Sequence, residues 1–418
     1  MNHSDSFSWR NGILHCEDVS LVDLAAQYGT PAYVYSRAGV LDRFQSYTNA
    51  LAGIRHRVCF AVKANSNIAL LNLLAARGAW FDIVSGGELF RVLAAGADPA
   101  TVVYSGVGKT REEMRLALDH GIHSFNCESE AEVALLAEVA CEAGRTAAIA
   151  LRVNPDVDAI THPYISTGLK EHKFGIDIAE VEAVYERVRR EPYLRAIGVS
   201  CHIGSQLLST APLLEAAGRV LELAKTLRAR GFPIEHLDLG GGLGVPYRPE
   251  EQASTIREFV HRLKQRLAGA EIELMLEPGR SVVAEAGILL TSVLYEKQNG
   301  SKRFLIVDAG MNDLIRPALY QAHHEIVPVV TRHGVPKVVA DIVGPVCETG
   351  DFFARNRQIA EVEPGGLLAI RTAGAYGFVL ASNYNSRRRP CELIVDGDSI
   401  HVARQRESYE DLIRGEHI

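Results

Sequence analysis

The sequence predicts an α/β plus all-β protein, in which a (β/α)8 barrel of the TIM type is followed by a β-barrel or β-sandwich domain. From about residue 37 to 280, short apolar runs alternate with segments of helical periodicity. Several helical segments end at a glycine, which commonly caps helices. After about residue 282 the pattern changes to short β-rich runs separated by Gly, Pro, Asn and Asp. We therefore expect a barrel domain at 36–281 and a β domain at 1–35 with 282–418.

Eight apolar runs bounded by turn-forming residues are expected to form the barrel strands, in chain order 58–62, 80–84, 102–104, 123–126, 147–153, 197–202, 236–239 and 272–276. The helical segments between them include 68–77, 128–142, 178–190, 213–230 and 255–267, and the expected caps are Gly78, Gly96, Gly121, Gly144 and Gly231. Eight repeats over about 250 residues match a (β/α)8 barrel. A doubly wound parallel sheet is the alternative, because the sequence does not show strand order.

The β-rich runs of the second domain are 288–295, 303–307, 326–330, 337–343, 367–371, 391–395 and 399–403. The segment 31–35 near the N-terminus is expected to pair with them. The stretch 162–175 is expected to form a loop at the substrate pocket.

Composition excludes several classes of function. The chain has 418 residues, of which 47% are hydrophobic, and a net charge of −7, which disfavours a nucleic-acid partner. We expect no membrane span, because no apolar run has the required length, and no signal peptide, because the first residues are polar. Seven cysteines without a C-x-x-C pair favour a reducing, cytoplasmic location and argue against disulfides or a structural zinc site. We expect no metal.

Lys63 ends the first apolar run, 58–62, and precedes a polar turn. Desolvation at such a position favours the neutral amine, which is the form that attacks an aldehyde. A lysine at a strand end is more often an ordinary surface residue. The functional interpretation therefore depends on what lies at the ends of the other strands.

The later strands end in chemically distinct groups: an imidazole at His202, a glycine run at 240–242, and a carboxylate and a guanidinium at Glu277 and Arg280. Each has a structural alternative, namely a core histidine, a tight turn and a surface salt bridge. In a parallel barrel all strands end on one face, so the groups are expected to meet there.

An amine, a phosphate-binding glycine loop and a carboxylate together are what pyridoxal 5'-phosphate requires. The lysine would hold the aldehyde as a Schiff base, the loop would bind the phosphate, and the carboxylate would pair with the pyridine nitrogen. A second glycine segment, 106–110, looks like the end of a nucleotide-binding loop, but Val103 stands where the first glycine is required.

Five segments, 61–65, 202–205, 240–242, 277–280 and 347–351, resemble the alanine-racemase-fold amino-acid decarboxylases, which use pyridoxal phosphate. Among these the whole chain is similar to the diaminopimelate decarboxylase family. The resemblance implies a homodimer with shared active sites. It also implies conversion of meso-2,6-diaminopimelate to L-lysine and CO2, the final step of lysine biosynthesis.

The resemblance also implies residue roles. Lys63 would bind the aldehyde, His202 would stack on the ring, Glu277 would pair with its nitrogen, and Cys347 of the partner subunit would be the acid that reprotonates the substrate carbon. The phosphate would be held by Ser205, Gly240, Gly241, Gly242, Pro278, Gly279 and Arg280. Substrate would be bound by Arg280, Arg316, Tyr320, Glu348 and Tyr376, of which Tyr376 would also touch the cofactor. Asp82 and Arg152 match pocket positions less closely.

Three alternatives stay open at this point. A decarboxylase of the same fold could act on ornithine, arginine, a D-amino acid or carboxynorspermidine. A homologue without activity could bind the cofactor or regulate a partner, although the presence of Lys63, Glu277 and Cys347 argues against it. A barrel enzyme acting on phosphosugars could use Lys63 as a Schiff-base lysine, although the β domain argues against it.

Overall fold

The computed structural model describes residues 6–157 and 173–418, so that most of the expected pocket loop, 162–172, lies outside the described residues. The chain divides into two compact units. One, here called the barrel unit, comprises Phe44–Val245 and Gln252–Ser281. The other, the β unit, comprises Met1–Arg43, Pro246–Glu251 and Val282–Ile418.

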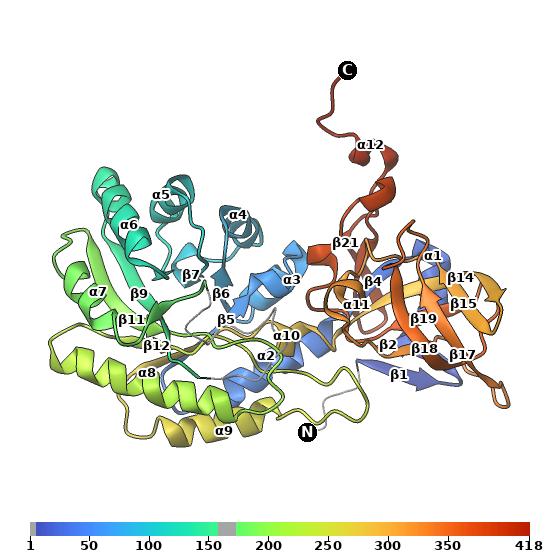
Figure 1. Ribbon diagram of the computed structural model, residues 1–418, viewed down its shortest axis with the longest axis horizontal. Coiled ribbons are helices and arrows are strands. Elements are labelled where there is room, and N and C mark those ends of the chain that lie inside the picture. The colour runs from blue at the N-terminus through green and yellow to red at the C-terminus, as the bar shows by residue number, and fades with distance from the viewer. Residues whose placement is uncertain (1–5, 158–172) are drawn as a thin grey trace. The chain divides into compact units, whose positions relative to one another are not determined.

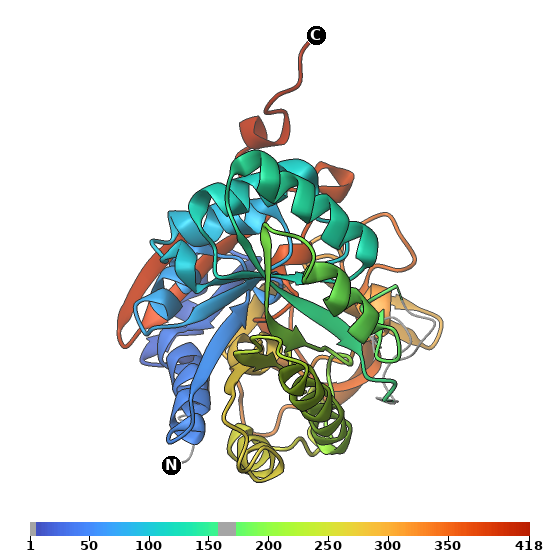
Figure 2. The same ribbon diagram turned by 90° about the vertical axis from the view of Figure 1, so that its left-hand side faces the viewer.

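The barrel unit contains a closed ring of parallel strands, drawn from blue to olive in Figure 2 with helices around it. In the part of the unit that the structure describes, the ring consists of β5 (His56–Ala61), β6 (Trp80–Ile83), β7 (Val102–Tyr104), β8 (Ser124–Cys127), β9 (Ala147–Asn154), β11 (Leu194–Ser200), β12 (His236–Asp238) and β13 (Glu273–Leu276). Each strand pairs with the next, and β13 pairs with β5, which closes the ring. The prediction of a (β/α)8 barrel is confirmed, and the doubly wound sheet is wrong because an open sheet would leave two unpaired edges.

Helices separate these strands: α3 (Ile68–Ala75), α4 (Gly86–Ala94), α5 (Arg111–His120), α6 (Glu130–Ala143), α7 (Val181–Val188), α8 (Ala211–Ala229) and α9 (Ile256–Arg266). Asn67, Ser85, Thr110, Ser129 and Thr255 cap five of them, each side chain accepting a hydrogen bond from the first turn. Thr255 was expected inside its helix and instead precedes it as the cap. The five glycines expected as C-caps all have positive φ. Two further elements complete the unit: helix α2 (Arg37–Leu51), which crosses its boundary with the β unit, and a short strand β10 (Ile176–Asp177), which pairs with β9.

The β unit is built on a mixed sheet in the order β18-β17-β15-β14-β4-β20-β21. These strands are β4 (Ala32–Ser36), β14 (Gly287–Asn299), β15 (Lys302–Val307), β17 (Lys337–Val343), β18 (Phe352–Ala360), β20 (Cys391–Asp396) and β21 (Ser399–Arg404). Strand β19 (Leu367–Ile370) pairs with β14 and with β16 (Ile326–Pro328). Because β4 lies between β14 and β20, the prediction that the N-terminal segment pairs with this domain is confirmed.

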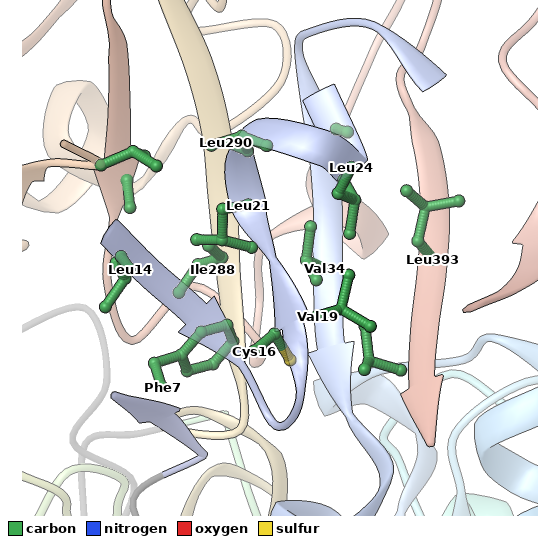
Figure 3. Close-up of a cluster of buried hydrophobic side chains, with 14 of the residues drawn as sticks. Phe7, Leu14, Cys16, Val19, Leu21, Leu24, Val34, Ile288, Leu290 and Leu393 are labelled. Carbon is green, nitrogen blue, oxygen red and sulfur yellow. The ribbon is translucent and has the colours of Figure 1, made fainter. Parts of the chain in front are cut away.

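The remaining elements of the β unit are β1 (Phe7–Arg10), β2 (Ile13–Cys16), β3 (Val19–Ser20), α1 (Leu21–Tyr28), α10 (Arg280–Val283, which crosses the unit boundary), α11 (Arg316–Tyr320) and α12 (Tyr409–Leu412). The three strands form a small antiparallel sheet. Side chains from it, from α1 and from the main sheet meet in an apolar cluster that includes Phe7, Leu14, Leu24, Ile288 and Leu393 (Figure 3). This cluster attaches the N-terminal segment to strands that contain Ile288 and Leu393, far later in the chain.

Two features of the β unit were not expected from the sequence. Strand β18 was missed, because its centre reads Arg355-Asn356-Arg357-Gln358 and lies at the edge of the sheet, where polar residues are tolerated. Strand β14 continues four residues beyond the expected end at 295. Its last residues are exposed and polar, so they lack the apolar pattern from which the strand was predicted. Among the described residues, no helix is long and apolar enough to cross a membrane.

Candidate active site

Strand β5, labelled in Figure 1, is followed by a 3-10 turn formed by Val62–Ala64. Lys63 lies in this turn, just beyond the carboxyl end of the strand. Its Nζ atom is 2.5 Å from Oδ2 of Asp82, which lies on the neighbouring strand β6. The Asp82 side chain is fully buried, whereas 36% of the Lys63 side chain is exposed. The amine is thus paired with a carboxylate and partly exposed, whereas the sequence suggested a desolvated amine at the strand end.

Two buried carboxyl groups, Asp238 at the end of β12 and Glu277 directly after β13, lie on adjacent strands. The side-chain amide of Asn126 donates to Asp238 Oδ2 at 3.1 Å and to Glu277 Oε1 at 3.4 Å. Burial raises the pKa of Glu277 well above its usual range, and the negative charges of Asp238 and Asp82 add to this shift. Burial also raises the pKa of Asp238. Burial thus favours the protonated form of both carboxyl groups, and this is the form of Glu277 that can give a proton to a basic ring nitrogen.

The structural alternative, a surface salt bridge between Glu277 and Arg280, is wrong because both residues are buried. Arg280 Nη2 instead donates to Ser205 Oγ at 3.2 Å. The turn that leads to Arg280 is tightly packed, since a Cβ atom on Gly279 would lie 2.8 Å from the Cβ atom of Ala64. The turn of Lys63 and the turn after β13 are thus held against each other.

The glycine loop after β12 approaches both His202 and the loop of Glu277. Gly240 has φ +64°, and a Cβ atom on Gly241 would lie 2.3 Å from the Glu277 carbonyl oxygen, so a side chain is excluded there. The Gly241 N–H donates to Nδ1 of His202 at 3.3 Å. Burial lowers the pKa of His202 well below its usual value, and the charges of Arg152 and Lys63 lower it further. The imidazole is therefore neutral, with its proton on Nε2.

A cavity of about 200 Å³ opens between these groups. Its lining comprises Lys63, Val84, Ser105, Gly106, Asn126, Arg152, Phe174, Ser200, Cys201, His202, Asp238 and Glu277. The structure thus brings together the amine, the imidazole and the carboxyl group that the sequence placed at separate strand ends.

A second charged network adjoins the cavity, because Arg152 belongs both to the network and to the cavity lining. Lys109 is buried and donates to Glu132 Oε1 at 2.6 Å, and Glu132 in turn accepts the Glu128 N–H at 2.8 Å. The Glu128 side chain binds Arg152 at 2.9 Å and the Gly175 N–H at 3.2 Å. Lys109, the lysine of the apparent nucleotide loop, therefore has a structural role in the loops after β7, β8 and β9.

Sequence reasoning gave no role to Asp238, Asn126, Ser105 or Glu128. All four lie at the ends of predicted strands or within two residues beyond them, as Lys63 and Glu277 do. In a parallel barrel, polar residues at the carboxyl ends of the strands are candidates for the active site. These four residues would have been found if every polar residue at such a position had been considered.

The remaining expected residues lie in the β unit. Arg316 begins α11 and is buried, and Tyr320 ends it. Cys347 and Glu348 lie on an exposed loop, where the Cys347 N–H donates to Asn385 Oδ1 at 3.0 Å and the Tyr384 hydroxyl donates to Glu348. The expected contact residue Tyr376 has φ +54°, an uncommon conformation for a tyrosine and therefore a sign of local constraint.

The barrel residues fit pyridoxal phosphate. An amine at Lys63 suits its aldehyde, a buried carboxyl group at Glu277 suits its ring nitrogen, and the neutral His202 side chain lines the same cavity. The glycine loop leaves no room for side chains, so that its backbone can come close to a phosphate group.

Comparison with known proteins places this geometry in a family. Residues 37–284 match the family described as pyridoxal-dependent decarboxylase, pyridoxal binding domain. The diaminopimelate decarboxylase of Pseudomonas aeruginosa is 56% identical over 412 residues, which cover 99% of each chain.

Solved structures agree. The diaminopimelate decarboxylase of M. jannaschii, in complex with L-lysine, has a TM-score of 0.95 at 36% identity, covering 100% of this chain and 99% of that one. The Helicobacter pylori enzyme, also in complex with L-lysine, has a TM-score of 0.91 at 43% identity, with coverage of 94% and 98%. The chain therefore belongs to the diaminopimelate decarboxylase family of pyridoxal-dependent decarboxylases.

Proposed function

We propose that this protein uses pyridoxal 5'-phosphate to decarboxylate meso-2,6-diaminopimelate to L-lysine and CO2, the final step of lysine biosynthesis. The observation that carries the proposal is the buried Glu277, which lines the same cavity as Lys63 and whose pKa is raised by burial and by the charge of Asp238. When bound, the cofactor accepts the electron pair of the bond that breaks as CO2 leaves.

The chain's own residues would support this chemistry in distinct ways. Lys63 would bind the aldehyde and Asp82 would orient the amine. Glu277 would hold a proton at the ring nitrogen, which strengthens electron withdrawal, and His202 would cover the ring. Gly240, Gly241, Gly242, Ser205, Pro278, Gly279 and Arg280 would surround the phosphate.

The β unit would supply groups for substrate and for proton return. We assign substrate binding to Arg316, Tyr320, Glu348 and Tyr376, together with Arg280 of the barrel unit. The Cys347 thiol would donate a proton to the substrate carbon. The family resemblance supports a cytoplasmic homodimer in which Cys347 serves the site of the partner subunit, with the barrel domain spanning 36–281 and the β domain 1–35 and 282–418.

The substrate assignment is favoured over ornithine, arginine, a D-amino acid or carboxynorspermidine for two reasons. The relative at 56% identity is a diaminopimelate decarboxylase. In addition, Arg280 and Arg316 offer positive charge for a distal carboxylate, and Glu348 offers negative charge for a distal ammonium, whereas a plain diamino acid needs no such arginines.

Product analysis tests the proposal. Purified protein with pyridoxal phosphate would be given meso-diaminopimelate, lysine, ornithine or arginine in separate tubes. Lysine and CO2 from diaminopimelate alone are expected. A diamine from one of the other amino acids would instead identify a neighbouring decarboxylase, and no product in any tube would contradict catalysis of these substrates.

A further inference from the structure

The imidazole of His324 links the proposed substrate arginine to the sheet of the β unit. His324 lies between α11 and β16 and is fully buried. Its Nδ1 atom is 2.8 Å from the Arg371 carbonyl oxygen, directly after β19, and its Nε2 atom is 2.9 Å from Nη1 of Arg316. The sequence suggested no role for this residue, since the pair His323-His324 lacks the spacing of a metal motif.

The two contacts define the protonation state of His324. A carbonyl oxygen can only accept a hydrogen bond, so Nδ1 must carry a hydrogen. A guanidinium can only donate, so Nε2 must present its lone pair to Arg316. The imidazole is therefore neutral, and its tautomer follows from the chemistry of its partners rather than from visible hydrogen atoms.

Neighbouring groups reinforce this arrangement. Tyr247, from the short segment 246–251 that belongs to the β unit, packs edge-on against His324 with ring centroids 5.2 Å apart. The face of the same tyrosine ring lies 4.4 Å from the Arg316 guanidinium carbon. Arg357 donates to the His324 carbonyl oxygen at 3.0 Å. The guanidinium groups of Arg316, at the ring, and of Arg357, at the backbone carbonyl, disfavour a positive charge on the imidazole.

We propose that His324 is a positioning residue that fixes the plane of the Arg316 guanidinium for a substrate carboxylate. Bidentate recognition of a carboxylate requires the guanidinium and the carboxylate to be coplanar, so the rotation of the guanidinium decides the strength of binding. The His324 lone pair sets this rotation from the edge, and the Tyr247 ring sets it from the face. The inference rests on the proposed role of Arg316 in binding substrate.

Four single variants and one double variant test the proposal through KM and kcat for diaminopimelate. His324→Phe keeps an aromatic ring but removes both hydrogen bonds, and we expect KM to rise about 10-fold or more while kcat changes less than about 3-fold. His324→Gln can donate to Arg371 and accept from Arg316, so it should recover most of the affinity. Arg316→Leu should raise KM at least as much as His324→Phe does. The double variant His324→Phe/Arg316→Leu should have a KM no higher than that of Arg316→Leu alone. His323→Gln is the matched control and should leave KM unchanged.

The outcomes distinguish the positioning role of His324 from the substrate-binding role of Arg316. If Arg316→Leu raises KM and His324→Phe does not, positioning by His324 is wrong and the substrate site stands. If Arg316→Leu leaves KM unchanged, the assignment of Arg316 is wrong, and the role of His324 fails with it. Nitrogen-15 NMR of histidine-labelled protein gives a readout independent of activity, including when His324→Phe does not fold. Hydrogen on Nδ1 is expected, and hydrogen on Nε2, or on both nitrogens at neutral pH, would overturn the proposal.

Discussion

The residues assigned to catalysis and substrate binding come from two regions, the carboxyl end of the barrel and the loops of the β unit, and these regions differ in how regular their geometry is. In the barrel unit, Lys63, His202 and Glu277 each lie within two residues of a strand end. In the β unit, Arg316 lies on a short helix, and Cys347 and Tyr376 lie in irregular segments. A ring of parallel strands delivers every carboxyl end to one edge, whereas strands of a mixed sheet end on both sides. Topology therefore predicts site residues in the barrel unit but not in the β unit.

The two regions also differ in exposure. The barrel groups Asp82, Asp238 and Glu277 are buried and positioned by hydrogen bonds before any ligand binds. Cys347 and Glu348 are exposed on their loop. A preorganised set of charges suits chemistry on a fixed cofactor, and exposed loop residues suit the proposed contact with a partner subunit. Substitutions in each region test this contrast.

The largest expected effect is on the barrel side. Glu277→Ala removes the carboxyl group assigned to the ring nitrogen, and turnover of diaminopimelate should fall about 10²–10⁴-fold because electron withdrawal weakens. The measurement is kcat, with cofactor loading checked by absorbance. Glu235→Ala, at the opposite end of the barrel, is the control and should be near normal. Near-normal turnover of Glu277→Ala would rule out the assigned role.

A smaller loss is expected from the exposed loop. Cys347→Ala removes the proposed acid, and because water can partly replace a proton donor, kcat should fall about 10²-fold. Steady-state assays of lysine formation measure this loss. Cys141, the other exposed cysteine among the described residues, provides the control Cys141→Ala. If Cys347→Ala forms lysine at the normal rate, the proton donor is a different group.

Burial also predicts that loss of a buried ion pair lowers the stability of the protein more than loss of an exposed one. Lys109→Met leaves the Glu132 carboxylate buried without its partner and should lower the free energy of unfolding by ~3–5 kcal/mol. The double variant Lys109→Met/Glu132→Leu should recover much of this loss. The exposed pair Lys225–Glu222 is the control, since Lys225→Met should cost less than ~1 kcal/mol. Urea unfolding measures all three variants, and equal losses for Lys109→Met and Lys225→Met would contradict the contrast.

The smallest expected effect, measured per pH unit, is a pH dependence of stability that has opposite signs in the two units. Burial lowers the pKa of His236 in the barrel unit from 6.5 to about 3, so an unfolded chain binds a proton that the folded chain does not. Burial raises the pKa of Asp313 in the β unit from 3.8 to about 7, so the folded chain keeps a proton that the unfolded chain has lost. His236 therefore costs stability as pH falls from about 6.5 towards 3, and Asp313 costs stability as pH rises from about 4 to 7.

Single substitutions isolate the contributions of His236 and Asp313 to the pH dependence of stability. In the unsubstituted protein, His236 makes the free energy of unfolding fall as the pH is lowered, by up to about 1.4 kcal/mol per pH unit, the value for one proton. His236→Phe should remove this contribution. Asp313→Asn should change the slope by a similar amount in the opposite direction between pH 4 and 7. Unfolding free energies measured across this range decide the matter. Parallel curves for variant and unsubstituted protein would show that the residue concerned does not titrate as stated.

The sequence by itself determined the alternation of strands and helices, the helix caps and the residues at the strand ends. These features are local, since periodicity, capping and turn formation depend on residues a few positions apart. Lys63, His202, the 240–242 loop and Glu277 could therefore be selected before any coordinates existed. Strand β18 could not, because its polar edge position hides the apolar pattern on which the prediction depends.

Only the tertiary structure decided how these residues act on one another. It closed the ring, paired Lys63 with Asp82, buried Lys109 against Glu132 and directed the His324 lone pair at Arg316. The Asn126 amide reaches Asp238 across 112 positions of sequence, which no local pattern encodes. Charge states and tautomers depend on distance and burial, and these are fixed only when distant segments pack together.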